Sequence, residues 1–113
     1  MNRFNRDQIL GLIRESKSQA KRGKVSESIR ILESLPKELF SPSNDIGWRV
    51  VSQMVTHYNK LSFSSADRLQ PLKKAENCLL EWICTCHKEQ RPIKEKLVRL
   101  LLMTASNLSL IHI

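Results

Sequence analysis

The chain has 113 residues, the size of one small domain, of which 41% are hydrophobic and 27% are charged. That composition is typical of a globular protein, and no apolar run approaches the roughly 20 residues that a membrane-spanning helix needs. The formal net charge of +8 favours polyanionic partners such as RNA, DNA, acidic proteins or anionic lipid.

Residues 9–36 predict two short helices joined by a tight turn. Apolar or small residues recur at helical spacing in two sets, Ile9, Ile13, Ser16 and Ala20, then Val25, Ser28, Ile29, Leu32 and Leu35. Gly23 separates them, because glycine takes the left-handed conformation that ends a helix at little steric cost. We therefore expect a first helix that runs to about residue 22 and a second that ends at about residue 35, with Asn5 or Asp7 capping the first, Ser26 capping the second, and Pro36 closing it.

Three more helices are expected further along the chain. After a loop over 37–44, Asn44 or Asp45 should cap a helix over 46–59, whose apolar stripe is the strongest period in the sequence. Residues 61–70 mix serine with charge and predict a linker. Pro71 suits the first turn of a helix over 72–88, and Pro92 should begin a fifth helix in the same way. The fifth helix has an apolar face made of Ile93, Leu97, Leu100, Leu101 and Met103.

The expected fold is all-α, with about five helices stacked as antiparallel hairpins in the manner of an α-solenoid. The opening hairpin resembles a tetratricopeptide or pentatricopeptide repeat unit. The residues that carry the resemblance are Ile9, Leu12 and Ile13, the run from Gly23 to Leu32, then Leu35-Pro36 and Ser41-Pro42. The match covers about one unit, and the 47 residues between Ile46 and Ile93 exceed the usual 34-residue period. An all-helical domain without true repeats is therefore an alternative.

The two families imply different functions. Resemblance to the tetratricopeptide class implies peptide or protein binding in a concave groove. Resemblance to the pentatricopeptide class implies binding of single-stranded RNA through polar side chains such as Asn5 and Asp45, although both also suit helix caps. The leading hypothesis is a non-enzymatic helical scaffold that binds a protein partner. The alternatives are single-stranded RNA binding and a non-catalytic piece of a larger enzyme.

Basic residues are concentrated in the first hairpin. The candidate residues for binding a polyanion or another partner are Arg14, Lys17, Lys21, Arg22 and Lys24. A solvated helix face is the simpler interpretation of the same charges. A mitochondrial presequence is disfavoured by Asp7 and Glu15, since such peptides contain few acids.

No set of residues predicts catalysis, a cofactor or a metal. Cys84, Cys86 and His87, with Cys78, have poor spacing for zinc, because ligands two apart on a helix point in divergent directions. The odd number of cysteines predicts reduced, buried thiols in an intracellular compartment, which is the cytoplasm, nucleus or mitochondrion. His57 is expected at the edge of the core, and Trp48 and Trp82 inside it.

The last six residues, 108–113, read LSLIHI. One reading frame of the transposase mosaic-end DNA used in sequencing adapters translates to the same letters. We therefore expect a single helical domain over 1–107, a non-native tail over 108–113, and a chain that is a fragment. A fifth helix without its neighbour should then expose Leu97, Leu100 and Leu101 as a partner face.

Overall fold

The computed structural model describes residues 5–111, and the regular structure in this range is entirely helical. Its elements are α1 (Arg6–Lys21), α2 (Val25–Glu33), a short 3-10 helix η1 (Lys37–Phe40), α3 (Gly47–Ser64), α4 (Leu69–Lys88) and α5 (Glu95–Ile111). The expectation of an all-α fold is confirmed for these residues. No helix in the described range combines the length and apolar character needed to cross a bilayer.

Several predicted helix ends are present. The Asn5 side chain accepts a hydrogen bond from the Gln8 amide at 2.8 Å, and the Gln8 side chain accepts one from the Asn5 amide at 2.9 Å. Gly23 has φ +83°, the left-handed conformation expected after α1. The predicted cap at Ser26 is wrong, since Ser26 lies inside α2, which begins at Val25 without a side-chain cap.

Two predicted boundaries in the second half of the chain are also wrong. The linker expected over 61–70 is mostly helix, because α3 continues to Ser64 and α4 begins at Leu69. The serines of this stretch are compatible with a helix since their hydroxyls donate to carbonyls of the preceding turn, as Ser62 does to Asn59 at 2.6 Å. Pro92 does not begin α5, which starts at Glu95 after a turn in which Gln90 has φ +55°.

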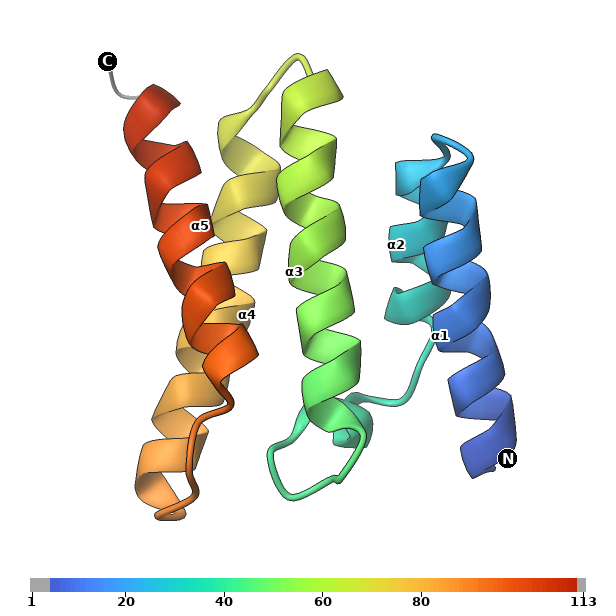
Figure 1. The fold of residues 1–113 in the computed structure, drawn as a ribbon, viewed down its shortest axis with the longest axis vertical. Helices are drawn as coiled ribbons and strands as arrows, with labels where there is room; N and C mark the ends of the chain where they lie inside the picture. The colour runs from blue at the N-terminus through green and yellow to red at the C-terminus, as the bar shows by residue number, and fades with distance from the viewer. Residues whose placement is uncertain (1–4, 112–113) are drawn as a thin grey trace.

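Helix α3 lies at the centre of the molecule and packs against each of the other four helices. Figure 1 shows the chain rising along α1, α3 and α5 and descending along α2 and α4. Consecutive helices pack on one another, and α1 and α5 also contact α3. One continuous core results, with fully buried side chains that include Leu32, Val50, Val55, Ala75, Leu79 and Leu97.

Candidate functional site

A buried polar contact joins the first hairpin to α3. The Ser16 hydroxyl donates to the Ser28 carbonyl at 2.7 Å and lies 3.2 Å from His57 Nε2, which also contacts Gln53. Burial, assisted by the charge of Lys60, lowers the pKa of His57 to about 4. A serine beside a neutral histidine has the components of a nucleophile and a base, yet Ser16 is fully buried and out of reach of any substrate. The contact therefore holds helices together, and His57 lies inside the core rather than at its edge.

A second polar cluster joins α3 to α5. The Asn59 amide nitrogen donates to the Val55 carbonyl at 3.0 Å and to the Thr104 hydroxyl at 2.9 Å. Thr104 donates in turn to the Leu100 carbonyl at 2.8 Å, and Asn107 donates to Asn59 Oδ1 at 2.8 Å. Every side-chain donor and acceptor at the centre of this cluster is used within the fold, so it positions α5 and leaves no group free for chemistry.

The three cysteines lie in different environments. Cys86 is buried, Cys78 is half-buried and Cys84 is exposed, so the expectation of buried thiols is wrong for Cys84. Burial, with Glu81 and Glu33 nearby, raises the pKa of the Cys78 thiol, and burial also raises that of Cys86. Both therefore remain thiols rather than the thiolates that bind metals or attack substrates. Between residues 5 and 111, no three His, Cys, Asp or Glu side chains form a group able to hold a metal.

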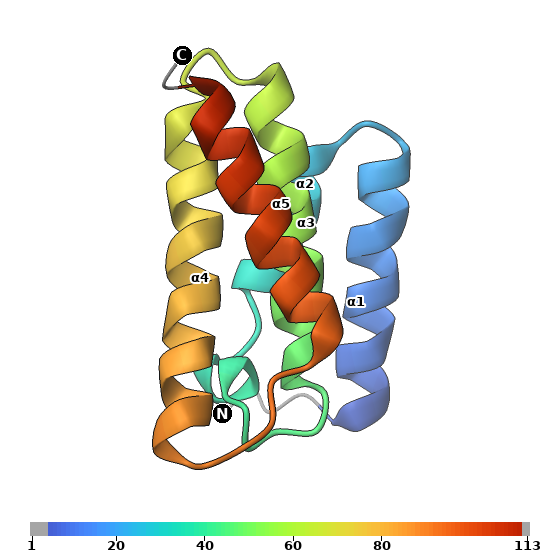
Figure 2. The same ribbon diagram turned by 60° about the vertical axis from the view of Figure 1, so that its left-hand side comes forward.

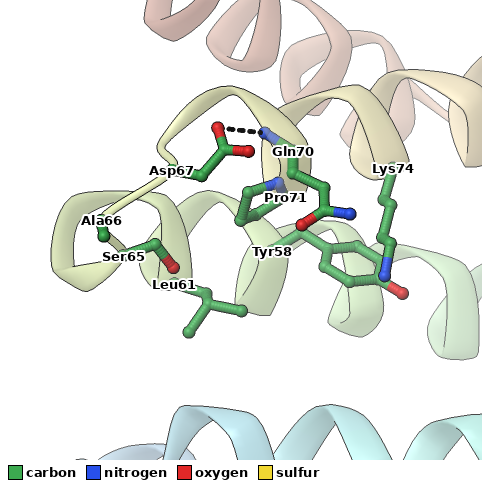
Figure 3. A pocket seen from close by; sticks show the side chains of 8 residues that line it. All are labelled: Tyr58, Leu61, Ser65, Ala66, Asp67, Gln70, Pro71 and Lys74. Carbon is green, nitrogen blue, oxygen red and sulfur yellow. Dashed lines mark hydrogen bonds between the residues drawn. The ribbon is translucent and has the colours of Figure 1, made fainter.

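A small hollow of about 210 Å³ lies where α3 meets α4. Figure 3 shows Tyr58 and Lys74 at one end of it and Asp67 at the other. One oxygen of the Asp67 carboxylate, Oδ1, accepts hydrogen bonds from the first two amides of α4, those of Leu69 at 3.1 Å and Gln70 at 3.3 Å. Burial raises the pKa of Tyr58 to about 12, so this phenol stays protonated near neutral pH. The hollow thus contains no acid–base pair suited to catalysis.

A larger groove of about 530 Å³ opens between α2, η1, α3 and α4. Apolar side chains dominate it, among them Phe40, Met54 and Trp82, and its charged groups are Glu33, Lys37 and Glu81. It contains neither a histidine nor a convergent set of hydrogen-bonding side chains. The groove is therefore an exposed margin of the core and has no recognisable reaction chemistry.

Two aromatic rings near the surface are covered by cations. The Arg49 guanidinium and the Lys94 ammonium lie 5.4 and 5.2 Å from the centre of the Trp48 ring, which is half-buried rather than in the core as expected. Arg68 lies in the same way over Phe63, at 5.5 Å. These rings are already engaged, and they lie outside the basic first hairpin.

The predicted basic residues are all on the surface. Arg14, Lys17 and Lys21 recur at helical spacing along one side of α1, and Arg22 and Lys24 lie in the turn that follows. None of the five forms an ion pair with another residue in the described part of the chain.

Packing adds Lys60 of α3 to this group. Its ammonium donates to the Ala20 carbonyl at the end of α1, at 3.0 Å. We call these six cations the basic surface: Arg14, Lys17, Lys21, Arg22, Lys24 and Lys60. Sequence reasoning missed Lys60 because it lies 36 residues beyond Lys24 and only the contact between α1 and α3 brings it there.

The exposure predicted for Leu97 and Leu100 on α5 is wrong. Leu97 is fully buried, Leu100 is 9% exposed and Leu101 is half-buried, because α5 turns this stripe toward α3 and α4. The exposed apolar residues of α5 instead include Val98 and Met103, each 39% exposed, and Leu102, 66% exposed. Of the tail, residues up to Ile111 continue α5, whereas 112–113 lie outside the described residues.

Comparisons with known proteins identify no family for this chain. No family model matches it, and no curated protein or solved structure matches it significantly. The resemblance of the opening hairpin to tetratricopeptide and pentatricopeptide units stays a prediction. Functional inference therefore depends on the surfaces described above.

Proposed function

We propose that this protein is a non-enzymatic helical scaffold that binds a protein partner. In this proposal α1 with α2, and α3 with α4, are antiparallel hairpins stacked as in a solenoid, and α5 belongs to a third unit. The order of packing supports it, since each helix lies against the next and α1, α3 and α5 lie side by side (Figure 1). The three free thiols favour a reducing, intracellular compartment.

The basic surface is the proposed binding site, and its partner is an acidic segment of another protein. The observation that carries this proposal is that the five cations of the first hairpin are exposed and have no carboxylate partner among the described residues. Each exposed ion pair with a partner contributes only about 0.2–1 kcal/mol, so several must form together and salt must weaken them. The site thus predicts moderate, salt-sensitive affinity.

Single-stranded RNA is the second candidate, because the same charges attract phosphates. Proteins that recognise single-stranded RNA usually also present aromatic side chains on which the bases stack. Residues 5–39 contain no aromatic residue, and the half-buried indole of Trp48 is already covered by Arg49 and Lys94. These observations favour an acidic polypeptide over RNA.

Titration of labelled ligands by fluorescence anisotropy tests the proposal. The ligands are a Glu-rich peptide and a single-stranded RNA of equal charge, each measured in low and high salt. The double variant Lys17→Glu/Lys21→Glu should weaken peptide binding by about tenfold or more, since two attractive contacts become repulsive. The matched control Lys88→Glu/Lys96→Glu changes the net charge equally at exposed sites on α4 and α5, and should stay within about twofold.

Each outcome decides between the candidates. Tight binding of RNA with no binding of the peptide would replace the protein partner by RNA. Equal losses in both double variants would show attraction to net charge alone and reject the basic surface as a site. The absence of binding to either ligand in low salt would reject both candidates.

A further inference from the structure

Helices α2 and α4 have matching patterns of buried residues. Four buried positions in and after α2 recur 47 residues later in α4, as Val25 and Leu72, Ser28 and Ala75, Leu32 and Leu79, and Leu35 and Trp82. In both helices the second position is a small residue with no exposed surface. A small side chain there lets the neighbouring helix approach closely, and each of the two helices packs against the helix that precedes it.

The same shift of 47 residues relates α3 to α5. The fully buried Val50 of α3 corresponds to the fully buried Leu97 of α5, and the buried His57 corresponds to the buried Thr104. The shift thus places α5 in the position of α3, one unit further along the stack.

On one face of α5 the residues are much more exposed than their counterparts on α3. Val51 and Val55 of α3 are 3% and 0% exposed, whereas their counterparts Val98 and Leu102 are 39% and 66% exposed. The helix that follows α3 and packs along it is α4, and no helix in the described range follows α5. In Figure 2, α5 lies over α3 and α4 with its near side uncovered.

We propose that Val98 and Leu102, on the outer face of α5, dock an amphipathic helix supplied by a protein partner. The occupant is a helix of the α4 kind, with leucine, a small residue, leucine and an aromatic residue at positions i, i+3, i+7 and i+10, as in Leu72, Ala75, Leu79 and Trp82. The site lies on α5, which already packs against α3 and α4. It is independent of the basic surface, because α1 and α5 lie on opposite sides of α3 (Figure 1).

A synthetic peptide that copies residues 69–88 is the probe, and the 113-residue chain is the receptor. Labelled peptide titrated with the chain should bind saturably, and a peptide that contains Leu79→Asp should not. The chain variants Val98→Asp and Leu102→Asp should each weaken binding by about tenfold or more, because each places a carboxylate where apolar surface is buried. Both positions are exposed in the free chain, so circular dichroism should show unchanged helix content.

Met103→Asp is the matched control. Met103 has the same exposed fraction as Val98 and lies on the same helix, but five residues away and therefore on another side. It should change the affinity less than about twofold. Equal affinity in all three chain variants, or no binding of the unmodified peptide, would overturn the proposal. A dimer of the chain in sedimentation velocity that Val98→Asp dissociates would also overturn it, since a second copy would then occupy the face.

Discussion

The buried histidine between α1 and α3 predicts how stability depends on pH. His57 is 3% exposed, and burial lowers its pKa from the ordinary 6.5 to about 4. In the unfolded chain the imidazole takes up a proton near pH 6.5, whereas in the folded protein it stays neutral until about pH 4. Protons therefore bind preferentially to the unfolded state between these values. The free energy of unfolding should fall as the pH is lowered through this window, and this contribution should level off below it.

The loss of stability at low pH can be calculated from the change in the pKa of His57. One pKa unit corresponds to about 1.4 kcal/mol, so the fall in the pKa of His57 from 6.5 to about 4 sets an upper limit of about 3 kcal/mol. Gln53, which contacts the imidazole, is only half-buried, so its side chain can rearrange around a protonated His57 and reduce the cost of the charge. We therefore expect about 2 kcal/mol of stability to be lost between pH 6.5 and pH 4 through His57.

Urea unfolding at a series of pH values, for the protein and for His57→Gln, measures this contribution. Glutamine removes the titrating group while its amide still reaches Ser16, so subtracting the two pH profiles cancels the carboxylates that also titrate near pH 4. An NMR titration of the imidazole, assigned by its loss in the variant, reports the pKa directly. Parallel pH profiles, or a measured pKa of 6.5 or above, would refute the buried, neutral state of His57.

Two further substitutions test the packing. Thr104→Val removes the hydroxyl that accepts from Asn59 and should cost about 1–2 kcal/mol in urea unfolding, whereas the exposed Thr56→Val should cost less than about 0.5 kcal/mol. A Cβ at Gly47 would lie 2.6 Å from the carbonyl oxygens of Leu39 and Ser41, so Gly47→Ala should destabilise by about 2 kcal/mol. A Cβ at Gly11, in the middle of α1, would make only an ordinary contact with the Arg14 guanidinium at 4.0 Å, so Gly11→Ala should instead stabilise by about 0.5–1 kcal/mol. Equal costs within either pair would contradict the contacts described here.

Local signals in the chain predicted the helices and several of their ends. Asn5, Gly23 and Pro71 act through their own hydrogen bonds or backbone preferences, which do not depend on distant residues. The sequence places the start of α5 at Pro92, whereas the helix begins at Glu95, because the turn before it depends on Gln90, whose left-handed conformation no local pattern indicates. The serines of residues 61–70 predict a linker, but a buried serine such as Ser62 can lie in a helix because its hydroxyl donates to a carbonyl of the preceding turn.

The candidate surfaces were also predictable from the sequence only in part. The spacing of Arg14, Lys17 and Lys21 was enough to put them on one side of α1, since helical periodicity is local. The addition of Lys60, the burial of Leu97 and the exposure of Leu102 depend on how helices distant in sequence are rotated and packed against one another. The spacing of residues in the sequence determines which of them share a face of a helix. Which neighbour that face meets depends on contacts across the whole core, and these exist only once the helices have packed.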